Sequence, residues 1–417
     1  MKSLKFFLCA CITALGLTGV AQAENPPTTP PEATPAEIPP TTPPEAAPAE
    51  NPPTTPPEAA PAPYPSMSAS LSANPNPAIF NAGPFGMLMV TGVLSGGGFW
   101  QSHPAVDFFG KQNAIGYGDI TNATVIINKT YRPIQFFIQA GAYSLPAIGV
   151  PYVKSRKVDP ATFGFIQQGF VRFVFNPAFS LDVGALPTRM GDEYTFTFEN
   201  LNIQRGLLWN QENAVTKGVQ VNFTKDAWAT SVSWNDGFYS DHYTSASALI
   251  TYTFKNSDTL SAVAMGNYFG KIRANSFVAP VTLANSQIYN LIYTRTKGAW
   301  VISPYIQYTS VPNVPGWTPS GSTSGAALLL MYRFKPELSL SGRVEYISSS
   351  GGANLINGPG SNAWSFTITP TYQKDIFFIR AEASYVSIGS GTPGLMFGSE
   401  GLNRSQTRVF GETGVIF

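Results

Sequence analysis

Residues 361–388 read SNAWSFTITPTYQKDIFFIRAEASYVSI, and this stretch decides the fold. Between Trp364 and Tyr372 every second residue is apolar, and the residues between them are serine and threonine. The segment from Phe377 to Tyr385 alternates in the same way. A period of two residues is that of a β-strand with unlike faces. The short QKD join predicts that the two strands pair antiparallel.

The apolar face of this hairpin ends in aromatic residues on both strands, and the opposite face is small, hydroxylated and carries a few charges. A soluble sandwich would bury its apolar face in a compact core. Aromatic residues at both ends of an apolar band are instead typical of strands that cross an outer membrane and enclose a wet interior. We therefore interpret the rest of the chain as repeats of this hairpin.

The composition supports a membrane β-barrel. The chain has 417 residues, of which 43% are hydrophobic and only 12% charged, and this charged fraction is about half the usual one. Beyond the N-terminus no apolar run is long enough to predict a transmembrane helix. Low charge without helical spans favours a barrel, because half of each strand faces lipid and half faces water.

The N-terminus predicts export. Residues 1–23 have a basic start, an apolar middle and a final Ala-Gln-Ala, which together are typical of a cleaved signal peptide. Both cysteines, Cys9 and Cys11, lie inside this segment, so the mature protein is expected to contain none. A disulfide framework and a cysteine-based zinc site are therefore not expected.

Residues 24–65 form a low-complexity segment in which TTPPEA begins at Thr28, Thr41 and Thr54. Proline at this density predicts a disordered leader with an extended polyproline II path. One interpretation is a periplasmic tether or a contact to the cell wall. The other is a leader whose exact sequence does not matter. Residues 66–86 are expected to be a linker.

From Met87 to the C-terminus, residues 87–417, the pattern predicts an all-β, transmembrane, antiparallel up-and-down β-barrel. Short joins follow the even-numbered strands and longer, Gly-, Ser-, Asn- and Pro-rich joins follow the odd ones, as in barrels with periplasmic turns and external loops. About sixteen strands are predicted, with fourteen or eighteen also open. They cover 87–96, 117–128, 133–144, 165–175, 178–186, 215–224, 227–236, 245–255, 258–268, 285–295, 298–309, 323–334, 337–348, 361–373, 376–388 and 405–417.

The last strand ends in Phe417. A C-terminal phenylalanine on a final strand is expected to be the assembly signal that the barrel-insertion machinery reads.

The chain resembles the OmpL-like β-barrel porin family. The resemblance is carried by DVGALPTRMGDEYTFTFENLNIQRGLLWN and WATSVSWNDGFYS, and continues through PYIQYT, SGRVEYI, FFIRAEASYV and the closing SQTRVFGETGVIF. It covers most of residues 165–417. It implies an outer-membrane porin, whose neighbours in the membrane are lipids and whose solutes are small and hydrophilic. It also suggests a homotrimer.

The longest join, residues 187–213, is the third long loop, which in general porins folds into the barrel and narrows the pore. Residues 200–209 of it are expected to form a short helix, and its charges would set ion preference. The alternative is an external loop with solvated charges. The candidate constriction residues are Arg189, Asp192, Glu193, Glu199, Arg205 and Glu212. These lean toward cations, whereas residues 66–417 carry a net +5, so selectivity stays open.

Further charges fall on the predicted inward faces of strands. They either pair across neighbouring strands and brace the wall or line the solute path. These lumen-facing charges are Arg172, Asp182, Arg343, Glu345, Arg380, Glu382, Arg408 and Glu412.

Tryptophans near predicted strand ends are candidates for anchors at the membrane interface. Ordinary hydrophobic contacts are the alternative. The residues are Trp100, Trp228, Trp234, Trp300 and Trp364.

The sequence offers little for catalysis. His103 and His242 are the only histidines, too few for a histidine-based metal site, and no cofactor or nucleic-acid contact is expected. His242 beside Asp241 supplies half of a hydrolase pair, although a surface pair is more typical. We therefore expect an outer-membrane porin and no enzyme. The rivals are a plugged barrel used for anchoring or adhesion and, less strongly, a barrel enzyme.

Overall fold

A computed structural model of the protein describes residues 70–107, 111, 113–131 and 133–417. The expected signal peptide and proline-rich leader lie outside the described residues.

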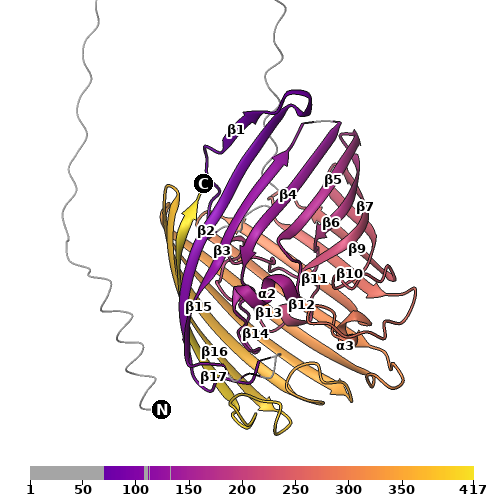
Figure 1. Ribbon diagram of the computed structural model, residues 1–417, viewed down its shortest axis with the longest axis vertical. Coiled ribbons are helices and arrows are strands. Elements are labelled where there is room, and N and C mark those ends of the chain that lie inside the picture. Colours follow the sequence, from indigo (N-terminus) through magenta and orange to yellow (C-terminus); the bar gives the residue numbers. More distant parts are fainter. Residues whose placement is uncertain (1–69, 108–110, 112, 132) are drawn as a thin grey trace, which may run out of the picture. The chain divides into compact units, whose positions relative to one another are not determined.

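In the described part of the chain, sixteen antiparallel strands pair in sequence order, and the last pairs with the first to close a barrel (Figure 1). The expected fold class and a strand number of sixteen are confirmed. The barrel strands are β2 (Met87–Gln101), β3 (Gly116–Lys129), β4 (Ile134–Tyr143), β5 (Ile166–Asn176), β6 (Phe179–Pro187), β7 (Val215–Lys225), β8 (Trp228–Asn235), β9 (Ser245–Thr253), β10 (Thr259–Asn267), β11 (Gln287–Lys297), β12 (Trp300–Val311), β13 (Gly321–Lys335), β14 (Leu338–Gly351), β15 (Asn362–Lys374), β16 (Phe377–Ser390) and β17 (Ser405–Ile416).

The residues expected to form only a linker contain a short additional strand, β1 (Ala78–Asn81). It pairs with the start of β2, joined through the 3-10 turn Gly83–Phe85.

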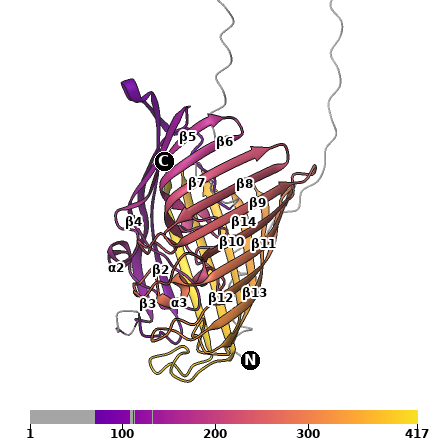
Figure 2. The same cartoon turned by 90° about the vertical axis from the view of Figure 1, so that its right-hand side faces the viewer.

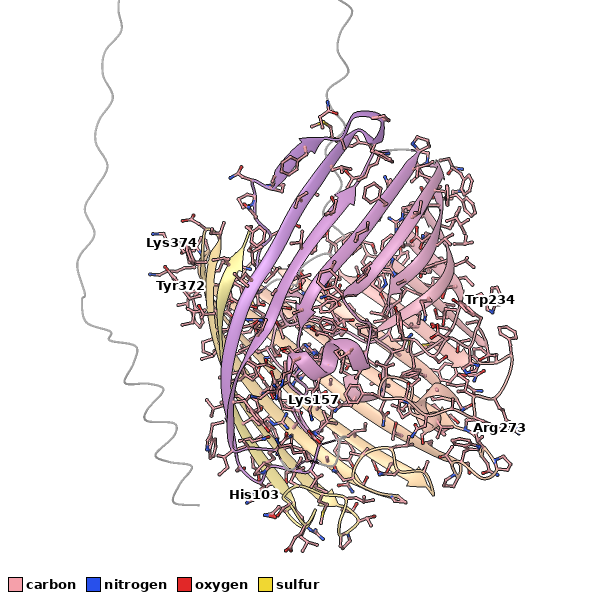
Figure 3. All side chains as sticks on the ribbon, viewed as in Figure 1. His103, Lys157, Trp234, Arg273, Tyr372 and Lys374 are labelled. Atoms are coloured by element: carbon pink, nitrogen blue, oxygen red, sulfur yellow. The ribbon has the colours of Figure 1, made fainter. Side chains whose placement is uncertain are left out.

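The short joins lie at one end of the barrel and the long loops at the other (Figures 1 and 2). Tyr372 and Lys374 mark the short-turn end, and His103 marks the long-loop end (Figure 3). The long loops contain α2 (Ser155–Ala161) and α3 (Val281–Ala284). Among the described residues, no helix has the length and apolar character needed to span a bilayer.

The tight turns use residues that accept a positive φ. Asp226, Gly298 and Asp375 each begin a two-residue join, with φ of 54°, 59° and 53°. Aspartate and glycine tolerate this conformation, which matches the twist of paired antiparallel strands. These residues therefore fix the register of three hairpins.

The two faces of the strands differ as the alternation predicts. On β15, Trp364, Phe366 and Ile368 are exposed on the outer surface, whereas Ser365 and Thr369 are fully buried on the inner one. The same period of two recurs on β16.

The strand β2 continues five residues beyond its predicted end, through Gly96, Gly97 and Gly98. A Cβ at Gly97 would lie 2.6 Å from the carbonyl oxygen of Gly411 on β17. Glycine allows this close approach. Because glycine has no side chain, the run shows no alternation, and the sequence pattern therefore stops short of the strand end.

The barrel interior is less polar than the pattern suggests, because several apolar clusters lie within it. We call the two with the most residues the β10–β13 cluster and the β2–β7 cluster, after the strands that supply most of their wall residues. In the first, Met190, Leu201 and Leu208 meet inward side chains such as Met265, Ile288, Leu329 and Met331. In the second, Leu71, Phe196 and Phe198 meet Val93, Ile126, Phe137, Phe170, Leu186, Phe378 and Ile416.

Candidate functional site

The chain between β6 and β7, residues 188–214, folds inward and is bonded to inward-facing side chains of the wall. We call it the lumen loop. Most of its residues are buried, including Phe196, Ile203 and Leu208, each at 0% exposure. It crosses the lumen and therefore narrows it.

The short helix expected at 200–209 does not form; the segment is irregular, with 3-10 turns at Thr197–Glu199 and Trp209–Gln211. Four of its backbone N–H groups bond to carboxylates of the wall instead of to the loop's own carbonyls; they belong to Ile203, Gln204, Leu207 and Leu208. This satisfies buried donors that a helix would otherwise pair internally.

Two glutamates of the wall accept these bonds. The carboxylate of Glu382 on β16 accepts from the backbone N–H of Ile203 at 2.5 Å and of Gln204 at 3.2 Å. That of Glu345 on β14 accepts from the N–H of Leu207 at 3.0 Å and of Leu208 at 3.3 Å. Bonds to an ionised acceptor are roughly twice as strong as neutral ones, so these two residues fix the loop.

Arg380 on β16 holds the other side of the loop backbone. It donates to the carbonyl oxygens of Thr197 at 2.9 Å and Asn200 at 3.1 Å, and it pairs with Glu412 of β17. Glu412 also accepts from the hydroxyl of Thr197 at 2.8 Å.

Arg343 on β14 links the loop to the wall through charge. It forms ion pairs with Glu193 of the loop and, at 3.2 Å, with Glu345. It also donates to the carbonyl oxygen of Gln204 at 2.8 Å.

The remaining inward charges act elsewhere. Arg408 on β17 donates to the carbonyl oxygen of Ala147 at 2.7 Å, tying the second long loop to the wall. Arg172 and Asp182 form a two-bond pair across β5 and β6, at 2.7 and 2.8 Å. All eight residues expected to face the lumen therefore occupy the inner face, and each makes a hydrogen bond or an ion pair there.

The charged residues of the lumen loop are brought into one region, but most are enclosed. Glu199 accepts from the backbone N–H of Phe196 at 2.9 Å, and burial raises its pKa to about 8. Arg205 is fully buried, 4.8 Å from the ring of Trp209, and burial lowers its pKa to about 10. Burial and neighbouring carboxylates raise the pKa of Glu212 well above its usual value.

Cavities lie on both sides of the lumen loop. At the long-loop end a cavity of about 290 Å³, which we call the outer cavity, is lined by apolar residues such as Val153, Phe163, Phe277 and Leu283. Toward the short-turn end a cavity of about 250 Å³, the inner cavity, is bordered by residues 187–194.

A smaller cavity of about 10 Å³ lies beside the two ends of the lumen loop; we call it the neck. Residues 187–190 line both the neck and the inner cavity. Asn213 and Thr216 line the neck, and their chain neighbours Glu212, Ala214 and Val215 line the outer cavity. The residues that line the neck include Thr188, Arg189, Asn213, Thr216, Gln220, Ser233 and Ser247. A volume of this size holds about one water molecule.

Residues 70–72, which we call the strap, are hydrogen-bonded to the lumen loop and to β15 near the short-turn end. The hydroxyl of Ser70 donates to the carbonyl oxygen of Asn200 at 2.8 Å. The backbone of Ser72 makes two hydrogen bonds with the side chain of Gln373, at 2.7 and 2.9 Å. Leu71 is 2% exposed within the β2–β7 cluster.

The expected interface tryptophans lie on the outside of the barrel. Trp100, Trp228, Trp234, Trp300 and Trp364 are each 46–53% exposed. Trp228 packs against Tyr252 and Trp300 against Tyr332, in each case with ring centroids 4.7 Å apart and the rings tilted by 54°.

Phe417 pairs through its backbone with Gly92 of β2, at 2.7 and 2.9 Å. His103 and His242 lie in different long loops, after β2 and after β8. In the described residues, His, Cys, Asp and Glu do not gather into a group of three that could hold a metal ion.

A closed sixteen-stranded barrel with aromatic residues around its outside and a loop folded into its lumen defines an outer-membrane porin-type channel. The chain belongs to the family described as "Putative beta-barrel porin-2, OmpL-like", whose profile matches residues 87–417.

Solved structures share the fold at low identity. The anion-selective porin from Comamonas acidovorans is 9% identical with a TM-score of 0.55, over 79% of this chain and 99% of that one. OmpT, an outer membrane protein of Vibrio cholerae, is 11% identical with a TM-score of 0.53, over 81% and 99%. The outer membrane channel DcaP of Acinetobacter baumannii is 10% identical with a TM-score of 0.53, over 79% and 97%. No curated protein matches the chain.

Proposed function

We propose that the protein lets small hydrophilic solutes and ions diffuse passively across the outer membrane. The observation that carries this proposal is the lumen loop, which lies inside a sixteen-stranded barrel with a cavity on either side of it. Sixteen strands enclose a space that side chains of the wall alone do not fill. The loop then limits the size of what passes.

In this proposal the loop charges set ion preference. Asp192, Glu193 and Arg189 border the inner cavity, where a local field acts on passing ions. Glu199 and Arg205 are enclosed among loop and wall residues and act by holding the loop's shape. No catalytic step is part of the proposal.

Single-channel conductance of the refolded mature chain in a planar bilayer tests the function. Steady openings are the expected result. A barrel that is folded, as shown by heat-modifiable mobility on a gel, yet carries no current would overturn the proposal.

A plugged barrel used for anchoring is the second candidate, and one observation favours it. The lumen loop and the strap together occupy much of the interior, and the neck between the outer and inner cavities has a volume of only about 10 Å³. The same recording decides between the two. The leader would then be the part that makes outside contacts, with the cell wall as its proposed partner.

We also propose an assembly. A homotrimer is supported by the trimer form recorded for OmpT of Vibrio cholerae, whose fold this chain shares. Cross-linking of the protein in native outer membranes should give a threefold mass, and a monomer alone would contradict it. We further propose that the leader lies in the periplasm and that Phe417 is read by the insertion machinery during assembly.

A further inference from the structure

The inner wall of the barrel is divided into two sectors with different chemistry. Strands β14–β17 carry the buried charges Arg343, Glu345, Arg380, Glu382, Arg408 and Glu412. Strands β7–β11 present hydroxyl, amide and apolar side chains instead, and no residue on their inward faces is charged. Among these inward residues are Thr216, Gln220, Ser231, Ser233, Ser245, Ser247, Thr251, Thr259, Ser261, Asn290 and Thr294.

The charged sector is occupied by the lumen loop. Glu382 and Glu345 each accept from two backbone N–H groups of the loop, and Arg380 and Arg343 donate to its carbonyls. These groups lie at 0–1% exposure. A solute that passed on this side would have to separate buried charges from their partners, which is costly in a medium of low polarity.

The hydroxyl sector borders the cavities. Thr259, Ser261 and Thr294 line the inner cavity. Thr216, Gln220, Ser233 and Ser247 line the neck. The outer cavity reaches the same side through Ala214 and Val215. The three cavities thus follow one another along β7–β11, from the long-loop end to the short-turn end.

One hydrogen bond closes the neck. The hydroxyl of Thr188, just after β6, donates to the side-chain oxygen of Asn213, just before β7, at 2.7 Å. This bond joins the two ends of the lumen loop. Across the neck, the hydroxyls of Ser233 and Ser247 lie 2.5 Å apart.

We propose that solutes cross beside the lumen loop, through the neck, and that the Thr188–Asn213 pair sets its width. This inference rests on the proposed channel function and locates its path. Apart from Arg189, the polar side chains that line the neck are hydroxyls and amides. These groups both donate and accept hydrogen bonds, so they replace the hydration of neutral polar solutes such as small polyols and amides. Its size admits water alone until Thr188 and Asn213 separate.

Cysteine modification tests the path, because the mature chain has no cysteine of its own. In the full mature protein, S247C should lose conductance several-fold after reaction with a charged methanethiosulfonate. The matched control is S341C, on the inner face of β14 in the charged sector, where the hydroxyl of Ser341 has no hydrogen-bond partner in the described structure. A fall in conductance after modification of S341C, with none for S247C, would contradict the proposed path and leave the channel function intact.

Removing the hydrogen bond between Thr188 and Asn213 tests whether this pair sets the width of the neck. N213A removes the acceptor and should raise both the conductance and the rate at which glycerol-loaded liposomes swell, whereas T188S keeps the donor and should behave as the native protein. If the native protein carries no current, N213A opening it would support the neck as a closed gate. If neither the native protein nor N213A carries a current, both the proposed path through the neck and the channel function are wrong. Heat-modifiable mobility shows that each variant is folded.

Discussion

Gly206 lies against the carboxylate of Glu345, so close that a Cβ at this position would overlap the glutamate oxygens. The approach is possible only for glycine, and it brings the N–H groups of Leu207 and Leu208 within hydrogen-bond distance of the same carboxylate. The glutamate cannot easily move aside, because Arg343 and the hydroxyl of Ser365 also bind it.

We expect G206A to destabilise the barrel. The added methyl group displaces Glu345 and leaves buried N–H groups without an acceptor, at about 1–3 kcal/mol for each unsatisfied donor. Thermal unfolding, followed by heat-modifiable gel mobility, should shift to lower temperature. G411A is the control, since a Cβ there meets nothing within 4 Å. Equal shifts in the two variants would contradict the role of the contact.

Replacing Glu382 should also loosen the lumen loop. E382A leaves the N–H groups of Ile203 and Gln204 without their acceptor, again a loss of about 1–3 kcal/mol for each. E382Q keeps one acceptor oxygen and should lose less. Hydrogen exchange at Ile203 and Gln204 measures the effect directly, with S341A as the control. Unchanged protection in E382A would contradict the role of Glu382 in holding the lumen loop.

Ion preference should depend on pH through Asp192. Burial raises the pKa of this carboxyl to about 7, and the residue borders the inner cavity. It is therefore neutral below roughly pH 6 and negative above roughly pH 8. The cation-to-anion permeability ratio should rise across this window, because a negative charge attracts cations. D192N should reduce the rise and leave the part due to Glu193, which borders the same cavity and whose pKa burial also raises to about 7. A rise of unchanged size in D192N would contradict the role of Asp192.

The strap should depend on Leu71. L71A removes most of its apolar anchor in the β2–β7 cluster, and a buried leucine cut to alanine loses about 2–5 kcal/mol. The strap has few other contacts, so we expect it to detach while the barrel stays folded. Limited proteolysis near residues 70–77 should then become faster. S72A is the control, because Gln373 binds the backbone of Ser72 and not its side chain.

The fold follows from the sequence because each barrel strand has one face in contact with the membrane. The alternation from Trp364 to Tyr372 indicates one apolar face and one polar face, and all sixteen predicted strands have a counterpart in the structure. The pattern fails where side chains are absent, as in Gly96–Gly98, and where an apolar residue faces inward, as Phe378 does. In both places a neighbouring segment, and not the strand itself, decides the environment.

The interior is harder to predict. Charge marks Glu345 and Glu382 as inward residues, but nothing local shows that they bind the backbone of a segment some 140 to 180 positions away. The helix expected at 200–209 fails for the same reason. The serines of the neck carry no distinguishing signal, since hydroxyls occur on every inward face. Leu71 is one apolar residue in a stretch without periodicity.

The glycines of β2 bear on how the barrel is made. They lie along the pairing with β17, where Arg408 meets Gln101, 307 residues earlier in the chain. Joining such distant segments has the largest entropy cost of any strand pair here, so this pair is expected to form last. Because these glycines have no side chains, the final two strands can pair without repacking side chains. For the same reason, β2 and β17 are the pair of strands expected to separate most readily during insertion.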